Sequence, residues 1–133
     1  MRKYNLMLIA FFCMSAVYAQ DSLQATIVLI GDAGQLTNGR QPVVRAVQTH
    51  IPLNKKTTVV YLGDNLYKTG LPDDMLPTYE IAKAPLDSQI MIAGKSPVNV
   101  YFIPGNHDWA NGGKNGYEYI LRVQNYIDVL GNK

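Results

Sequence analysis

The chain has 133 residues, of which 47% are hydrophobic and 17% charged, which suits one domain with a buried core. It carries twelve basic and ten acidic residues, but Arg2 and Lys3 lie in the N-terminal segment, so residues 20–133 carry ten of each and are formally neutral. These charges are scattered along the chain. The sequence therefore excludes a basic surface for nucleic acid, and we expect no nucleic acid binding.

The N-terminal segment is predicted to direct export. Two basic residues precede an apolar run at residues 6–17, and the small-residue pattern Val-Tyr-Ala ends at Ala19. The run is shorter than the roughly 20 apolar residues that span a bilayer, so cleavage near Ala19 is favoured over a membrane anchor. We predict a signal peptide at residues 1–19 and a periplasmic, cell-envelope or secreted domain at residues 20–133, without a transmembrane segment.

Three apolar runs rich in β-branched residues are typical of strands that are buried on both faces. They lie at residues 25–30, 57–62 and 98–103. A short helix is predicted between the first two runs, because Pro42 suits a first helical turn and valines at helical spacing follow it towards His50.

The remaining helices are predicted from chain breakers and from apolar periodicity. Four prolines interrupt the chain between the second and third runs, and there we expect one or two short helices, at residues 75–83 and 86–92. An apolar stripe at residues 117–130 indicates an amphipathic helix. The alternation of strands and helices predicts an α/β fold, in which helices flank a largely parallel or mixed β-sheet.

Each predicted strand is followed by a loop with glycine and an oxygen-bearing side chain. The loops are Gly-Asp-Ala-Gly at residues 31–34, Gly-Asp-Asn-Leu-Tyr at residues 63–67 and Gly-Asn-His-Asp at residues 105–108. Parallel strands deliver their C-terminal ends to one edge of a sheet, so Asp32, Asp64 and Asn106 are expected to meet. Cys13 is the only cysteine and lies in the predicted signal peptide, so ligands in the mature domain must offer oxygen or nitrogen.

This loop composition suits metal-dependent chemistry. Glycine lets the backbone turn sharply, and a carboxylate can bridge two cations, for which Asp64 is the central candidate. Two bound metals can clamp both ends of an in-line displacement at phosphorus, which suits hydrolysis of a phosphate ester. Taken singly, a Gly-Asp pair is more often a turn or a helix cap. Only the co-occurrence of the three loops favours a metal site.

The three loops, in this order, resemble the first three sequence blocks of the calcineurin-like metallophosphoesterase superfamily. Two positions make them most similar to the purple acid phosphatases. Gly34 stands where most of the superfamily has a histidine, and Tyr67 stands three residues after the presumed bridging aspartate. Because the resemblance spans only residue 27 to about residue 108 and the helix that follows, it implies the N-terminal half of the metallophosphoesterase α/β sandwich.

The resemblance also implies a ligand set. Asp32 would bind the first metal, Asp64 would bridge both, Tyr67 would bind the first metal as a tyrosinate, and Asn106 would offer its amide oxygen to the second. An anionic phenolate is a hard donor that suits ferric iron. The expected cofactors are therefore two metal ions, Fe(III) paired with Fe(II), Zn(II) or Mn(II).

The same resemblance assigns roles around the metals. His107 would hydrogen-bond the substrate phosphate or protonate the leaving alcohol, and Asn65 would help to position the phosphate. Asp108 would be structural or would orient His107 through its other ring nitrogen. The nucleophile would be a metal-bound hydroxide, so no covalent enzyme intermediate is implied.

The family contributes further metal-binding histidines from later blocks, whereas this chain has only His50 and His107. We therefore expect a fragment of a longer protein, with weak metal binding, poor catalysis in isolation and an unpaired sheet edge. The expected function is hydrolysis of phosphate esters, and the alternative is an inactive binding or cell-envelope module of the same fold. A nucleotide-binding domain is disfavoured, because no Gly-x-Gly-x-x-Gly or Gly-x-x-x-x-Gly-Lys loop is present. The sequence leaves the substrate, the metals and the oligomeric state open.

Overall fold

A computed structural model describes residues 24–131, and the predicted signal peptide lies outside the described residues. Its centre is a three-stranded parallel sheet in the order β1-β2-β3. The strands are β1 (Thr26–Ile30), β2 (Thr57–Tyr61) and β3 (Asn99–Phe102). Ile30 pairs with Tyr61, and Tyr61 pairs with Phe102, so the three strands end at the same level. The predicted α/β fold and the shared edge for the three loops are confirmed.

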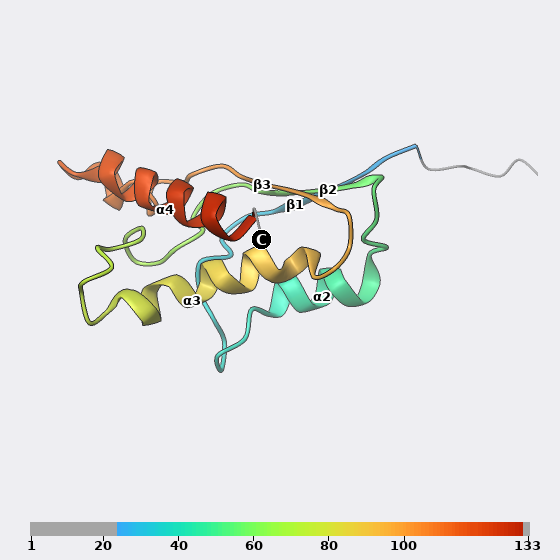
Figure 1. Cartoon of the computed structure of the whole chain (residues 1–133), viewed down its shortest axis with the longest axis horizontal. Helices are drawn as coiled ribbons and strands as arrows, with labels where there is room; N and C mark the ends of the chain where they lie inside the picture. The colour runs from blue at the N-terminus through green and yellow to red at the C-terminus, as the bar shows by residue number, and fades with distance from the viewer. Residues whose placement is uncertain (1–23, 132–133) are drawn as a thin grey trace, which may run out of the picture.

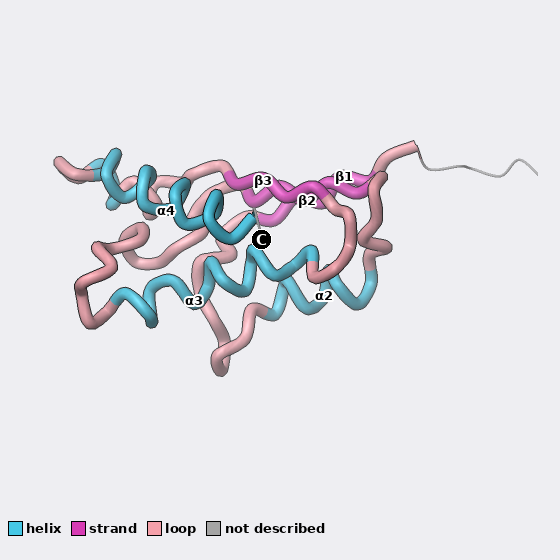
Figure 2. The backbone as a smooth tube through the Cα atoms, in the orientation of Figure 1, coloured by secondary structure: helices cyan, strands magenta, loops and turns pink. Residues whose placement is uncertain are grey.

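The helices are α2 (Pro42–His50), α3 (Tyr79–Ile90) and α4 (Gly116–Gly131), with short 3-10 turns η1 (Met91–Ala93) and η2 (Ala110–Gly112). Helices α2 and α3 lie side by side beneath one face of the sheet (Figure 1). The tube in Figure 2 shows that α4 follows the long loop after β3, lies mostly beyond the C-terminal ends of the strands and above the N-terminal part of α3, and runs back towards the sheet. No helix in the described part is long and apolar enough to cross a membrane.

Of the one or two short helices predicted between β2 and β3, the structure has one, α3. The predicted break before residue 86 is wrong, because α3 runs through Pro85 as one helix. Proline inside a helix removes a backbone hydrogen bond and costs about 3 kcal/mol. Burial offsets that cost here, since Pro85, Leu86 and Gln89 all lie in the interior, the last two with 0% of their surface exposed. The tertiary contacts of α3 therefore override the local signal of Pro85.

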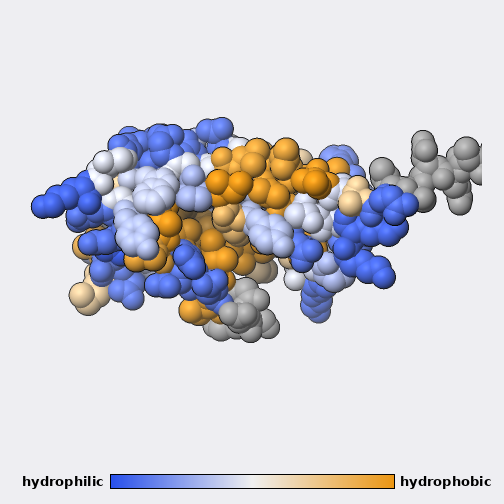
Figure 3. Space-filling model, turned by 90° about the horizontal axis from the view of Figure 1, so that it is seen from above, coloured by the Kyte–Doolittle hydropathy of each residue, from blue (hydrophilic) through white to orange (hydrophobic). Residues whose placement is uncertain are grey.

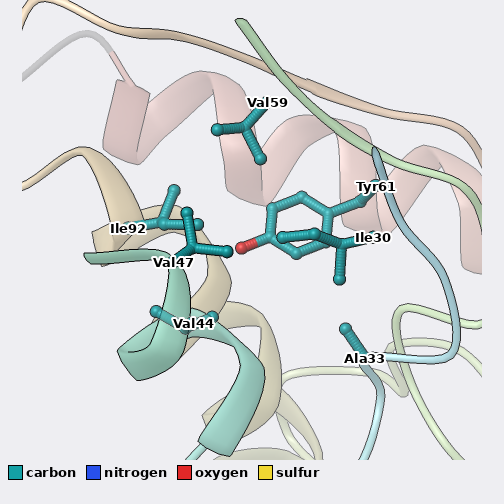
Figure 4. Packing of buried hydrophobic residues seen from close by; sticks show 7 residues of the cluster. All are labelled: Ile30, Ala33, Val44, Val47, Val59, Tyr61 and Ile92. Atoms are coloured by element: carbon teal, nitrogen blue, oxygen red, sulfur yellow. The ribbon is translucent and has the colours of Figure 1, made fainter. Parts of the chain in front are cut away.

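The core consists of two clusters. The first joins the sheet to α2 and η1 and is drawn in Figure 4. Its largest member, Tyr61, is fully buried, stacks on Phe102 with ring centroids 4.8 Å apart, and donates its hydroxyl to the carbonyl of Gln89 at 3.2 Å. The second cluster joins the loop after β2 to α3 and α4. It consists of Leu66, Leu71, Leu86 and Val123. The first cluster holds the loop after β1 through Ala33, and the second holds the loop after β2 through Leu66 and Leu71.

The opposite face of the sheet is apolar and exposed. Strand residues alternate between faces, so Val28 and Ile30 face α2 whereas Ile27 and Leu29 face away and are 67% and 62% exposed. Tyr101 on β3 is 58% exposed on the same outer face. The space-filling view from above shows this hydrophobic area over the sheet (Figure 3).

Candidate metal centre

The first two loops aim carboxylates at the same point. Asp32 and Asp64 come two and three residues after the ends of β1 and β2, and both have a positive φ, of 54° and 51°. This left-handed conformation is uncommon for residues other than glycine and is tolerated best by aspartate and asparagine. The amide of Asp32 donates to the carbonyl of Gly63 at 3.2 Å. The turns after β1 and β2 are therefore tied together where their acidic side chains emerge.

Two glycines permit the close approach of the loops. A Cβ atom on Gly34 would lie 2.6 Å from the carbonyl oxygen of Asp64, and a Cβ atom on Gly105 would clash with the amide and carboxylate of Asp64. No side chain fits at either position without a shift of the backbone. Gly34 and Gly105 thus bring the first and third loops into contact with the second.

Tyr67 lies between the two carboxylates. Its hydroxyl is 2.6 Å from Asp32 Oδ1 and 3.3 Å from Asp64 Oδ2. The hydrogen bond to Asp32, desolvation and the negative charges of both aspartates raise the pKa of Tyr67 well above its usual value. The phenol proton thus screens two carboxylates that would otherwise repel each other. Three hard oxygen donors converge here, which is the donor type that hard cations prefer.

The third loop contributes a histidine with a defined orientation. The amide of His107 donates to Asp64 Oδ1 at 3.1 Å, and its ring Nδ1 lies 2.7 Å from the carbonyl oxygen of Lys68. A carbonyl only accepts hydrogen bonds, so Nδ1 carries a proton. In the neutral ring the other nitrogen, Nε2, is then an acceptor. Its ring also meets the Tyr67 ring edge-on, with centroids 4.7 Å apart.

The expectation that Asp108 orients His107 is wrong, because the carbonyl of Lys68 does so. Asp108 is 1% exposed and accepts hydrogen bonds from the amides of Gly105, Asn65 and Leu66, at 2.8, 3.1 and 3.0 Å. Burial raises the pKa of Asp108 above its usual value, although the backbone donors oppose this. Asp108 therefore has the structural role that was the second possibility from the sequence. It ties the second loop to the third.

Asn65 does not lie where a phosphate-binding residue was expected. It is 1% exposed, and its side-chain amide donates to the carbonyl of Ile103 at 2.9 Å and to Asp108 at 3.1 Å. These contacts turn the side chain into the protein, towards the backbone carbonyl of Ile103 and the buried carboxylate of Asp108. Asn65 therefore supports the loops from beneath.

Sequence reasoning missed Gln89 and Lys68. Gln89 Nε2 donates to the carbonyls of Ala33 and Asn65, both at 2.8 Å, and so joins the first two loops from α3. The sequence gives no distinct signal for Gln89, because it follows two other polar residues, Asp87 and Ser88. Lys68 orients His107 through its backbone carbonyl, and a pattern of side-chain types gives no signal for a backbone contact.

The other predicted ligand, Asn106, is exposed on the third loop, next to the amide that binds Asp64. His50 ends α2, which runs back towards the start of β2, so it lies away from this edge. Among residues 24–131 no three or more His, Cys, Asp or Glu residues form a metal-binding cluster. A metal centre here would therefore depend on Asp32, Asp64 and oxygen donors of other types.

The match of the sequence to a protein family is a second line of evidence beside the fold and the three loops. A family model described as calcineurin-like phosphoesterase matches residues 25–132. The chain therefore belongs to the calcineurin-like phosphoesterase family, whose members in general hydrolyse phosphoesters with bound metal ions, usually two. Comparisons with curated proteins and with solved structures found no match.

Proposed function

We propose that the protein hydrolyses phosphate esters at a centre of two metal ions, in the manner of a purple acid phosphatase. The observation that carries this proposal is the position of the Tyr67 phenol within hydrogen-bonding distance of both Asp32 and Asp64. A phenol held by two carboxylates is a ligand set for a hard trivalent ion once its proton is released.

The donors present fit such a centre. Asp32 and Tyr67 would hold the first ion, Asp64 would bridge, and the Asn106 amide oxygen would bind the second. We propose Fe(III) for the first ion and Fe(II), Zn(II) or Mn(II) for the second. Such ions, when bound, would neutralise charge on a phosphoryl group and activate a water molecule as the nucleophile. Gly34 supports the proposed subtype, because a histidine there would collide with the backbone of Asp64.

His107 would act on the substrate. The carbonyl of Lys68 holds the Nδ1 proton, so a protonated ring can donate from Nε2 to a phosphate oxygen or give that proton to the leaving alcohol. The amide of His107 meanwhile holds Asp64 Oδ1. His107 would thus hold the bridging carboxylate through its backbone amide and act on the leaving oxygen through its ring.

We also propose that the protein is exported and loses residues 1–19. The basic start, the apolar run and the small-residue pattern at Ala19 support this assignment. Mass spectrometry of the protein recovered from the cell envelope or the medium should give a mature N-terminus near Gln20. An N-terminus at Met1 would contradict it.

Metal dependence tests the proposed function. The protein incubated with Fe(III) and Zn(II) should hydrolyse an aryl phosphate, at a modest rate given the few donors at the described centre. Removal of the metals with a chelator should abolish the reaction, and their return should restore it. Hydrolysis that survives complete metal removal, or metal-loaded protein without any turnover, would contradict the proposal.

A further inference from the structure

Asn111 links two parts of the proposed centre without belonging to it. It lies in η2, with φ 55° and ψ 35°, and its backbone amide donates to the carbonyl of Asn106 at 2.7 Å. Its side-chain oxygen accepts from Asn106 Nδ2 at 3.0 Å. Its side-chain nitrogen makes a long contact of 3.5 Å with the carbonyl of Lys68, which also receives the ring proton of His107.

These contacts fix the orientation of two side-chain amides. The carbonyl of Lys68 only accepts, so the NH2 group of Asn111 must face it, and the oxygen of Asn111 must then face Asn106. Asn106 in turn has to present its own NH2 group to that oxygen. The oxygen of Asn106 is left free on the other side of the amide, and only this oxygen can bind a metal ion.

We propose that Asn111 is a positioning residue that presents the amide oxygen of Asn106 to the metal centre. The inference rests on the proposed function. Before a metal binds, an unrestrained asparagine can adopt either orientation of its amide, and only one of them presents the oxygen to the centre. Groups that orient a metal ligand typically change metal affinity by about 10- to 100-fold. The left-handed backbone at Asn111 also favours asparagine over most other residues.

A double-mutant cycle on the full chain separates this role from a purely structural one. Asn111→Gly removes the side chain, and glycine adopts the same positive φ without strain. Asn106→Asp replaces the amide by a carboxylate, whose two oxygens both bind metal. With a carboxylate at position 106, either oxygen can face the metal, so Asn111 is no longer needed to orient the side chain. The affinity for Mn²⁺ alone is measured by calorimetry for the unchanged chain, both single variants and the double variant.

In the chain that keeps Asn106, Asn111→Gly is expected to weaken Mn²⁺ binding by about 10-fold or more. In the Asn106→Asp background the same substitution is expected to have little effect. Asn38→Gly is the matched control, because Asn38 also has a positive φ, of 52°, in the turn between β1 and α2. This control should leave the affinity unchanged.

Four outcomes would overturn the inference. Unchanged affinity in Asn111→Gly would show that Asn106 needs no orientation, and equal losses in both backgrounds would show that Asn111 only supports the loop. A chain that binds no Mn²⁺ at all would contradict the proposed function together with the inference. In the metal-free chain, the side-chain amide NMR signals of Asn106 should shift in Asn111→Gly, and unshifted signals would also contradict the hydrogen bond.

Discussion

Asp64→Asn is expected to weaken metal binding by at least about 100-fold and to abolish metal-dependent hydrolysis, because Asp64 is the proposed bridge between the ions. The substitution is nearly isosteric, and asparagine tolerates the φ of 51°. Its side-chain oxygen can still accept the amide of His107, which holds Asp64 Oδ1 at 3.1 Å. The change therefore removes one negative charge with little effect on the shape of the loop.

The stability of the metal-free protein should move in the opposite direction. Asp32 and Asp64 share the hydroxyl of Tyr67, so loss of one charge relieves their repulsion. The midpoint of thermal unfolding without metal should be unchanged or higher in Asp64→Asn. Calorimetric metal titration and thermal unfolding measure the two effects, with Asp74→Asn, an exposed aspartate before α3, as the control. Retained affinity in Asp64→Asn would contradict the assignment of the bridge.

Asp108→Ala should cause a large loss of stability, of about 3–5 kcal/mol. Three backbone amides and the side-chain amide of Asn65 donate to this buried carboxylate, and each buried donor left without an acceptor costs about 1–3 kcal/mol. Such a loss is a large part of the total stability of a small domain, about 5–15 kcal/mol. Urea denaturation measures the change.

A graded series shows whether the hydrogen bonds of Asp108 are responsible. In Asp108→Asn one oxygen can serve the donors that share Oδ2, while the NH2 group faces the amide of Leu66. This variant should fall between the unchanged chain and Asp108→Ala. Asp74→Ala at the surface should cost less than about 0.5 kcal/mol. A loss below about 1 kcal/mol in Asp108→Ala would contradict the structural role of the carboxylate.

The sequence predicts the elements that have local signals. Continuous β-branched runs identify the three strands, and glycine followed by a polar residue identifies the turns after them. Pro85 misleads, because the packing of Leu86 and Gln89 keeps α3 in one piece. That packing depends on residues far apart in the chain, which a local breaker signal does not include.

The same limit applies to the centre. The convergence of Asp32 and Asp64 follows from strand order and loop composition, whereas the place of Tyr67 beside them was implied only by the family resemblance. The partners of Asp108, by contrast, are Asn65 and Leu66, 43 and 42 residues earlier in the chain. Sequence spacing assigns Asp108 to its neighbour His107, whereas the folded chain places the carbonyl of Lys68 there. Residues that support a site through long-range backbone contacts therefore escape a motif-based prediction.

Tyr67 is the proposed metal ligand between two aspartates, and the visible absorption spectrum of the Fe(III)-loaded protein tests this role most directly. We predict a tyrosinate-to-ferric charge-transfer band and a purple colour, lost in Tyr67→Phe and kept in Tyr101→Phe, a tyrosine exposed on the outer face of the sheet. The chain has nine tyrosines, so this pair of variants is needed to assign the band. Iron-loaded protein without the band, or a band that persists in Tyr67→Phe, would contradict the claim.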